Sequence, residues 1–429
     1  MKFWPKASPT SLKPLKYACT VNPEALPEST DPDYEFDYID IGNVTLEQGI
    51  SGLQRMTFAN SPSRARKPLL GGDIIVSTVR TYLKAVAAVP AEAQDWVAST
   101  GFAVLRPNHD VDQRFLYRVV QSNPFVETVV AASTGVSYPA INPSTLGTIS
   151  VPLPDRETQR AIADFLDRET ARIDQLVEKR SAFAELVVAR RQSLVSTAVL
   201  GHAGVHSEWP GQIPQHWKAE RAKFHFREAQ ARSETGEEEL LTVSHITGVT
   251  KRSDKDVNMF LAESNEGYKL VEPGDLVINT MWAWMGAMGV SSDAGLISPS
   301  YGVYRPSSNE LLPQFIDLMV RSRPFIAEAT RRSKGIHSSR LRLYPDAFLD
   351  MPLPTPPLSE QEKILRDVSE RVAKEDALLS KNSDAEKLLR EYRAALITAA
   401  VTGQIDVSEH TRKGDTDRRL DAIEAEMRA

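Results

Sequence analysis

The sequence contains two long stretches in which apolar residues recur at helical spacing, and each follows a region of mixed texture. Between 155 and 200 there is no proline or glycine, and apolar residues recur at alternating intervals of four and three. This spacing is typical of a helix that packs along a second helix. Asp155 is a suitable N-cap and Gly201 a suitable C-terminal stop. The pattern predicts one long helix over 155–200.

A second long helix is predicted in the other half of the chain, over 358–403. It follows Pro356-Pro357, where Ser359 and Glu362 have the spacing of a capping box, and it stops at Gly403. Each helix would be about 40 residues long, or roughly 60 Å at 1.5 Å per residue. Helices with so polar a flank are poorly stable alone in water, so we expect the two to pair as a coiled coil.

The expected contact positions of this coiled coil follow the two apolar series. Polar residues interrupt the series, among them Glu169 and Arg180 in the first helix and Glu375 and Asn382 in the second. The apolar contact positions are Ile162, Leu166, Ile173, Leu176, Phe183, Val187 and Leu194 in the first helix, and Ile364, Val368, Leu378, Leu389, Tyr392 and Leu396 in the second. Long helices of this composition also occur as plain spacers, and that alternative stays open.

The two mixed regions that precede the helices carry the same motifs in the same order. Both contain short strand-like runs interrupted by proline and glycine. The segment 70–78 reads LGGDIIVST, and the segment 272–280 reads EPGDLVINT. The segment 99–107 reads STGFAVLRP, and the segment 298–306 reads SPSYGVYRP. The chain is therefore interpreted as a duplicated module.

The length of the repeat bears on the domain organisation. Matching segments lie roughly 200 residues apart, far more than the 20–50 residues of a solenoid unit. The expected fold class is α+β, with two mixed α/β domains related by internal duplication and separated by two long helices. The expected parts are a first module at 1–154, a first long helix at 155–200, a linker at 201–219, a second module at 220–357, a second long helix at 358–403 and a polar C-terminal tail at 404–429.

Composition limits the possibilities without naming a function. The chain has 429 residues, of which 41% are hydrophobic and 25% charged, as in ordinary globular proteins. Its net charge of −6 is no sign of nucleic-acid binding, although local patches set that affinity. Cys19 is the sole cysteine, which excludes an intrachain disulfide and a cysteine-based zinc site. We expect a cytoplasmic protein, since we find neither a signal peptide nor an apolar run of the roughly 20 residues that span a membrane.

Catalytic motifs are missing from the sequence. It contains no P-loop, no helical zinc-protease histidine pair and no Gly-x-Ser-x-Gly elbow. Asn123-Pro124-Phe125 partly resembles the loop with which amino-methyltransferases hold a target base, but the second proline of that loop is absent. The duplicate reads Arg323-Pro324-Phe325, and a turn that starts a helix explains both. We predict no catalytic, cofactor-binding or metal site in this chain.

Basic and polar residues gather near the repeated motifs. Between 321 and 342, seven arginines and lysines are opposed only by Glu328. Arginine interleaved with serine, threonine and asparagine suits a surface that holds phosphates and reads a few base edges, whereas the plainer alternative is a solvated charged face. The candidate nucleic-acid contacts are Arg64, Arg66, Lys67, Thr78, Arg80, Tyr82, Lys84, Thr134, Ser137 and Tyr138 in the first module, and Asn279, Thr280, Trp282, Trp284, Arg331, Arg332, Lys334, His337, Arg340 and Arg342 in the second.

The two modules differ most where such contacts would lie. The segment 133–138 reads STGVSY, and its counterpart 333–338 reads SKGIHS. The first module also lacks an arginine cluster that matches 321–342. A shared frame with different tips indicates two different targets.

Over nearly its whole length the chain resembles the specificity subunit of type I restriction–modification enzymes. The resemblance rests on the two GD motifs and on the two junctions between module and helix, VPLP at 151–154 and MPLP at 351–354. It implies two target recognition domains and an antiparallel coiled coil. Each domain would read one half of a bipartite, asymmetric DNA site, and the coil would set the gap and dock two methyltransferase subunits. Two restriction subunits are also possible partners.

The resemblance also implies that the chemistry belongs to other subunits. S-adenosylmethionine, ATP and Mg²⁺ would be bound by those partners, and the chain itself would be non-catalytic. A specificity subunit of a methylation-only or related restriction system has the same sequence features. A different class, a coiled-coil adaptor whose duplicated modules bind proteins, also stays open.

Overall fold

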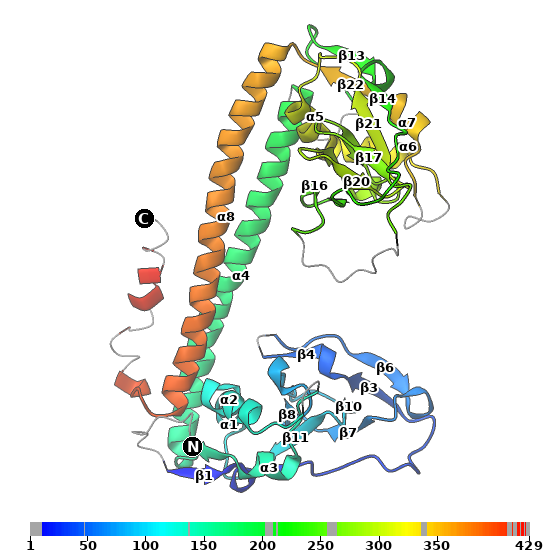
Figure 1. The fold of residues 1–429 in the computed structure, drawn as a ribbon. Helices are drawn as coiled ribbons and strands as arrows, with labels where there is room; N and C mark the ends of the chain where they lie inside the picture. Colours follow the sequence, from blue (N-terminus) through cyan, green and yellow to red (C-terminus); the bar gives the residue numbers. More distant parts are fainter. Residues whose placement is uncertain are drawn as a thin grey trace. The chain divides into compact units, whose positions relative to one another are not determined.

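The computed structural model describes residues 11–46, 48–135, 138–201, 209–211, 213–254, 264–335, 341–409, 414, 418–420, 422, 423 and 425. The chain forms two compact units, Met1–Ser181 with Lys381–Ala429, and Ala182–Ser380 (Figure 1). Each unit contains one module and one half of each long helix, α4 (Arg156–Leu200) and α8 (Leu358–Val401). Both long helices are thus where the sequence predicts them. The division into compact units cuts these helices, so the predicted domain boundaries stay predictions.

The first module is built from two four-stranded sheets. One has the strand order β2 (Cys19–Val21), β11 (Phe102–Pro107), β8 (Ile74–Ser77) and β9 (Val86–Ala88), all antiparallel. The other has the order β6 (Gln54–Thr57), β3 (Glu35–Ile39), β10 (Trp96–Ser99) and β7 (Ala65–Leu69), with β3 and β10 parallel. Two short pairs are β1 (Leu12–Pro14) with β12 (Ser150–Pro152) and β4 (Val44–Thr45) with β5 (Gly49–Ile50).

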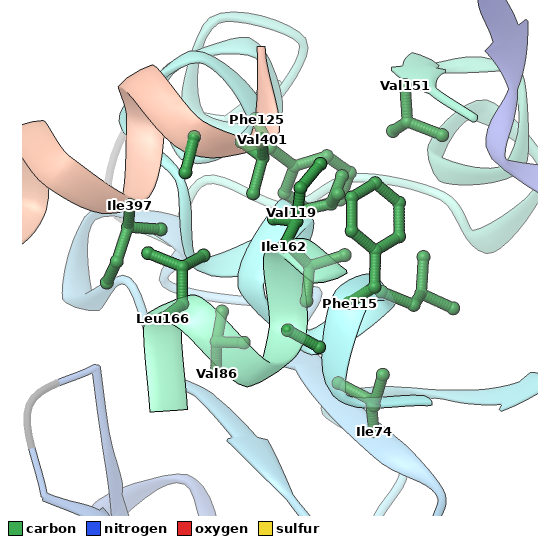
Figure 2. Packing of buried hydrophobic residues seen from close by; sticks show 14 of the residues in the cluster. Ile74, Val86, Phe115, Val119, Phe125, Val151, Ile162, Leu166, Ile397 and Val401 are labelled. Atoms are coloured by element: carbon green, nitrogen blue, oxygen red, sulfur yellow. The ribbon is translucent and has the colours of Figure 1, made fainter. Parts of the chain in front are cut away.

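Three α-helices and four 3₁₀ helices complete the part of the first module that the structure describes. The α-helices are α1 (Gln113–Gln121), α2 (Asn123–Ala131) and α3 (Pro143–Thr148), and the 3₁₀ helices are η1 (Leu15–Tyr17), η2 (Ile41–Asn43), η3 (Phe58–Asn60) and η4 (Thr81–Leu83). Figure 2 shows buried side chains of β8, α1, α2, α4 and α8 pointing toward one another. Phe115 and Phe125 lie in this cluster with Leu166 of α4 and Ile397 of α8. The module therefore shares one core with its ends of the long helices.

The second module repeats this plan. Its main sheet has the order β14 (Phe226–Glu228), β21 (Gly302–Pro306), β18 (Leu276–Ile278) and β19 (Met288–Val290). The other strand pairs are β13 (Lys218–Arg221) with β22 (Pro352–Thr355), β15 (Leu241–Ser244) with β16 (Gly248–Lys251), and β17 (Lys269–Val271) with β20 (Gly295–Ile297). The helices are α5 (Pro313–Val320), α6 (Arg323–Arg332), α7 (Pro345–Leu349), η5 (Ala222–Phe224) and η6 (Ala283–Met285). The duplication seen in the sequence is therefore a duplication of the fold.

The repeated GD and RP motifs belong to one structural device. Arg106 donates two hydrogen bonds to the buried carboxylate of Asp73, both at 2.9 Å, and Arg305 does the same to Asp275 at 3.0 Å. Such bidentate pairs are both strong and geometrically specific. Each aspartate also accepts the backbone N–H three residues before it, which closes the turn into the strand. The glycine before Asp73 has φ +97°, a conformation that favours glycine.

The junction motifs pin each module to its long helix. Gln159 accepts the backbone N–H of Asp112 at 2.8 Å and donates to the carbonyl of Pro154 at 2.8 Å. Gln361 accepts the N–H of Leu312 at 2.8 Å and donates to the carbonyl of Glu310 at 2.7 Å. Both glutamines are buried. Removing either side chain would leave buried backbone groups unpaired.

Within the first unit, the start of α4 and the end of α8 run antiparallel. Arg393 Nε donates to Asp174 Oδ1 at 2.8 Å, and Asn382 Nδ2 donates to the carbonyl of Arg180 at 3.1 Å. Residues further along α4 therefore contact residues earlier in α8, so the two helices run in opposite directions. Asn382 is buried, so this polar residue lies inside the contact. A buried asparagine of this kind specifies the register of paired helices.

Within the second unit, the end of α4 and the start of α8 are also antiparallel. Arg190 Nε lies 3.1 Å from Glu375 Oε1, and Val199, further along α4, shares a core with Ile364, earlier in α8. Glu375 is buried, as is Glu169 in the first unit. The polar residues that interrupt the apolar series therefore lie in the helix contact.

Two of the predicted contact residues are exposed. Phe183 is 40% exposed and Leu378 is 42% exposed. Glu375, one of the polar residues that interrupt the predicted series, is by contrast buried. Of the other predicted positions, Ile162, Leu166, Ile173, Val187, Val368, Leu389 and Leu396 are buried, and Leu176, Leu194, Ile364 and Tyr392 are half-buried.

The segments that follow the long helices add apolar side chains to the two cores. Trp209 Nε1 donates to the carbonyl of Pro352 at 2.7 Å, and its ring packs edge-on against Phe325 at 5.3 Å. Leu420 and Ile423, in the stretch predicted as a polar tail, are buried in the core of the first unit. In the part of the chain that the structure describes, no helix has the length and apolarity to cross a membrane.

Candidate nucleic-acid interface

In the first module, two separate segments meet at the end of β8. The backbone N–H of Ile141 donates to the carbonyl of Thr78 at 2.8 Å. Thr134 and Ala140 exchange two backbone hydrogen bonds of 2.9 Å and so close the loop between them. The described ends of this loop and the turn after β8 therefore form one surface, which we call the first tip (residues 78–84, 134, 135 and 138–140).

The second module builds the same arrangement at the end of β18. The N–H of Leu343 donates to the carbonyl of Thr280 at 3.0 Å, and Lys334 and Arg342 exchange backbone hydrogen bonds of 3.0 and 2.9 Å. We call this surface the second tip (residues 280–286, 334, 335, 341 and 342). The repeated backbone contacts place position 80 of one tip and position 282 of the other at equivalent points of the frame.

The side chains at these equivalent points differ in chemistry. Arg80 is exposed, and its guanidinium lies over the ring of Tyr138, 4.8 Å from the centroid. Tyr138 is itself 64% exposed. In the second tip, Trp282 is 50% exposed and stacks on Trp284, with 6.1 Å between centroids and 16° between planes. One tip offers a cation on an aromatic ring, and the other offers an aromatic pair.

Some of the predicted contact residues serve the fold. The hydroxyl of Thr78 donates to the carbonyl of Gly101 at 2.9 Å, and that of Thr280 donates to the carbonyl of Ser300 at 2.8 Å. Asn279 is buried, and its Oδ1 accepts the N–H of Met281 at 3.2 Å. These side chains hold the turn from which the exposed residues project.

Most cations of the first module have partners within the protein. Arg64 donates to the Tyr38 hydroxyl at 3.1 Å and to Asp40 at 2.6 Å, and these contacts raise the pKa of its guanidinium. Arg66 lies over the ring of Phe58. Burial lowers the pKa of the Lys67 ammonium, which lies in β7. Thus Arg66 and Lys67 lie in β7 and Arg64 lies in the turn just before it, outside the tip.

Two further residues of the first tip are placed by local contacts. Lys84 Nζ pairs with Glu127 Oε1 at 2.8 Å. Tyr82 is exposed, and Thr134 is exposed at the base of its loop. Ser137, predicted to be a contact, lies outside the described residues.

The arginine cluster of the second module is partly neutralised. Glu328 is buried in α6 and accepts hydrogen bonds from Arg331 at 2.6 and 2.7 Å and from Arg332 at 2.5 Å. Burial opposes ionisation of this carboxyl, but the two arginines outweigh it and lower its pKa. The side chain of Arg332 is only 23% exposed. Arg332 is therefore a structural partner of Glu328, which its spacing of four residues could have indicated.

The remaining cations of the second tip lie on its surface. Lys334 and Arg342 are exposed, and they flank the base of the loop. His337 and Arg340, also predicted contacts, fall outside the part of the chain that the structure describes. Arg321, the first cation of the cluster at 321–342, donates to the carbonyl of Ile246 at 2.6 Å and so ties the end of α5 to the β15–β16 turn.

One group of metal-ligand type occurs among the described residues, at the base of the second module. It contains Glu220, His225 and Glu310, whose ligand atoms lie within 4.8 Å of one another. His225 Nδ1 is 3.0 Å from the Ser308 hydroxyl, and Glu310 also pairs with Lys218 at 3.3 Å. Burial lowers the pKa of His225, whereas the two glutamates oppose that shift. His225 and Glu310 therefore each have a polar partner within the module, the Ser308 hydroxyl and Lys218.

The false resemblance to a methyltransferase loop is explained by packing. Pro124 and Pro324 lie in the first turn of α2 and α6, where proline is favoured. The rings of Phe125 and Phe325 are fully buried in the two cores. Neither ring is available to hold a base.

Comparison with known proteins agrees with this architecture. The sequence family described as the type I restriction modification DNA specificity domain matches residues 31–184. The specificity subunit of the type I restriction enzyme HindI of Haemophilus influenzae is 31% identical over 108 residues, which cover 24% of each chain. The specificity subunit of the type I restriction enzyme EcoKI of Escherichia coli is 21% identical over 318 residues, which cover 70% of this chain and 68% of that one.

A solved structure extends the likeness to the whole fold. A chain from a study of complex assembly in a type I R-M system superposes with a TM-score of 0.69 at 23% identity, and covers 94% of this chain and 99% of that one. The duplicated modules, the two long helices and these relatives lead to one conclusion. Residues 31–184 match the DNA specificity domain of type I restriction modification systems, and most of the chain is similar to the specificity subunits of type I restriction enzymes.

Proposed function

We propose that each module of this chain reads one half of a bipartite, asymmetric DNA site. The observation that carries this proposal is the contrast between the tips. Their backbone contacts are the same, but Arg80 with Tyr138 in one is replaced by Trp282 with Trp284 in the other. A frame that is kept while its exposed side chains change suits two readers of different sequences.

The two long helices set the gap between the half-sites in this proposal. Buried polar residues support that role, because Asn382 and Glu375 each have a defined partner across the helix pair. A shift of the helices against each other would leave both without partners. Buried polar residues at such positions are known to specify register.

The helices also dock two methyltransferase subunits, and two restriction subunits can join the complex. Exposed apolar side chains favour a protein partner along the helices of the second unit: Phe183, Leu186, Val188 and Leu378 are all exposed. A groove of about 710 Å³ in the same unit, lined by Leu318, Ile326, Leu365 and others, offers further apolar surface. S-adenosylmethionine, ATP and Mg²⁺ are bound by these partners, since specificity subunits of this family are in general non-catalytic. The complex acts on DNA in the cytoplasm.

The test is a base-resolution adenine methylome of the host with and without the gene for this chain. Loss of methylation at one gapped, two-part motif on deletion is the expected result, and it would spell out both half-sites. An unchanged methylome would contradict the proposal. A protein-binding adaptor would then be the better explanation, and the proteins that co-purify with the chain would identify its partners.

A methylation-only system is the nearest alternative within the family. It predicts the same methylome, so the two are separated by challenge with unmodified DNA. Cleavage of DNA that carries the unmethylated motif requires restriction subunits. Methylation without cleavage would assign the chain to a system that only modifies.

A further inference from the structure

We infer that positions 80 and 282 are the base-reading positions of the two tips and that they read by different chemistry. Arg80 hydrogen-bonds the major-groove edge of a guanine in one half-site, and Trp282 contacts the methyl group of a thymine in the other. This inference rests on the proposed function, because it names the chemistry at the surfaces that contact DNA.

The equivalence of the two positions follows from the frame. Thr78 and Thr280 each receive a backbone N–H from the returning loop and each donate their hydroxyl to the carbonyl of Gly101 or Ser300. Position 80 and position 282 each come two residues later, at the start of η4 or η6. The backbone therefore presents both side chains from the same point.

Arg80 is held in a conformation suited to directional hydrogen bonds. Its φ of +50° is unusual for a residue other than glycine. Its guanidinium lies over the Tyr138 ring, and in the described ranges no salt bridge joins it to a carboxylate. By contrast, Arg64 and Lys84 are paired with Asp40 and Glu127. A guanidinium held by a ring keeps its N–H donors in one plane, and arginine bound through two N–H groups to guanine O6 and N7 is the commonest base-specific contact.

Trp282 offers a different chemistry at the same point. The indole has no hydrogen-bond acceptor and only one donor, so a half-exposed tryptophan presents an apolar face. Trp284 stacks on the Trp282 ring, and its own Nε1 donates a hydrogen bond to the carbonyl of Met281 at 3.0 Å. In the major groove, the feature that an apolar side chain recognises is the thymine methyl group.

The turn that carries Trp282 is closely packed against α6. Gly286 closes η6 with a φ of +88°, and a Cβ atom there would lie 2.6 Å from Ile326 of α6. The equivalent residue in the first tip is Lys84, which also has a positive φ, +52°. Both tips thus hold the reading side chain on a fixed turn, as base recognition requires.

The test uses the complete complex of this chain with its methyltransferase partners and duplexes of the motif found by the methylome. Guanines are replaced singly by 7-deazaguanine, which lacks N7, and thymines singly by uracil, which lacks the methyl group. We expect one guanine of one half-site at which 7-deazaguanine weakens binding by about fivefold or more. We expect one thymine of the other half-site at which uracil weakens binding by about fourfold, the effect of one buried methyl group.

The variants decide which residue makes each contact. In Arg80→Ala, replacement of that guanine by 7-deazaguanine should no longer weaken binding. Arg80→Lys should behave in the same way, because an ammonium cannot donate two hydrogen bonds in the fixed geometry of a guanidinium. Trp282→Ala should bind thymine and uracil duplexes equally. Arg64→Ala and Phe224→Ala, which change a paired arginine and an exposed aromatic residue outside the tips, should keep the full effects.

The outcomes separate the two proposals. If no gapped motif exists, the proposed function fails. If the motif exists but Arg80→Ala and Trp282→Ala, assembled normally with the partners, keep the wild-type response to both analogues, this inference alone is overturned. The same holds if both analogue effects map to one half-site.

Discussion

The two modules of this chain have nearly the same interior hydrogen bonds and quite different exposed side chains. Asp73 with Arg106 repeats as Asp275 with Arg305, and the anchoring of Gln159 repeats at Gln361. At the tips, by contrast, Arg80 is exchanged for Trp282. Duplication makes each module a control for the other: a contact present in both serves the fold, whereas a difference at an exposed position is free to serve a target.

The largest effect is expected from the ion pair that both modules share. Asp73→Asn should lower the free energy of unfolding of the first module by about 3–5 kcal/mol, because it removes the charge of the buried partner of Arg106 and leaves that arginine only its exposed contact with Glu24. Asp275→Asn should do the same to the second module. Urea unfolding followed by module-resolved hydrogen exchange measures both effects.

Matched controls exist on the same arginines. Glu24 and Glu272 pair with Arg106 and Arg305 on the exposed side, so Glu24→Gln and Glu272→Gln should change stability little. A large loss for one aspartate variant and none for the other would show that the two modules do not depend on a common frame.

A smaller effect should separate structural from DNA-binding cations in the second module. Arg331→Ala with Arg332→Ala leaves Glu328 buried without its partners and should destabilise the module by about 1–3 kcal/mol. Lys334→Ala with Arg342→Ala removes exposed cations at the tip. It should lower the salt dependence of DNA binding by about one unit of slope for each lost phosphate contact and leave stability unchanged.

For Arg331 and Arg332 the sequence alone predicted DNA contacts, whereas the structure indicates that they stabilise the buried Glu328. Salt titration of DNA binding together with thermal unfolding decides between the two. A flattened salt dependence in the Arg331 and Arg332 variant, with unchanged stability, would restore the assignment made from sequence.

The next prediction concerns Asn382, which is buried in the helix pair of the first unit. Asn382 donates to a backbone carbonyl, but its Oδ1 has no hydrogen-bond partner among the described residues. Asn382→Leu should therefore stabilise the helix contact by about 1 kcal/mol, while it relaxes the register. Thermal unfolding measures the gain, and methylation of sites with altered gaps measures the register. Full retention of the original gap preference would show that Asn382 does not specify register.

Sequence reasoning succeeded where a signal repeats along the chain. The apolar series predicted both long helices, and the duplicated motifs predicted the duplicated module. It did not show that the GD and RP motifs contact each other, because Asp73 and Arg106 are brought together only by pairing of β8 with β11. It did not indicate that Phe183 and Leu378 would be exposed while the interrupting residues Glu375 and Asn382 are buried, since apolar spacing carries no information on which polar side chains find a partner.

For the candidate interface, sequence indicated the region but not the roles within it. Arg80, Tyr138, Trp282 and Trp284 do lie at the tips. Thr78 and Asn279 have the residue types of base readers, yet backbone geometry uses their side chains to hold the turn. Whether a polar side chain is available to a ligand depends on its neighbours in space.

The smallest effect concerns a feature of the second module alone. His225 ends η5, and the equivalent residue after η1 in the first module is Ala18. Burial lowers the pKa of His225 and Lys218 lowers it further, while Glu220 and Glu310 raise it less than burial lowers it. The folded module therefore binds a proton less readily than the unfolded chain. Its stability should be complete above the unfolded pKa of about 6.5 and should decline as the pH falls from there through the folded value.

His225→Ala copies the first module and removes this dependence. Hydrogen exchange measures the free energy of unfolding of the second module between pH 7.5 and 5.5. As the pH falls, this free energy should decrease more steeply in the wild type than in His225→Ala. Only the difference between the two slopes reports on His225, because Glu220 and Glu310 are present in both proteins. Equal slopes for the wild type and His225→Ala would show that the glutamates fully compensate for burial, and the base of the second module would then respond to acid no differently from the first.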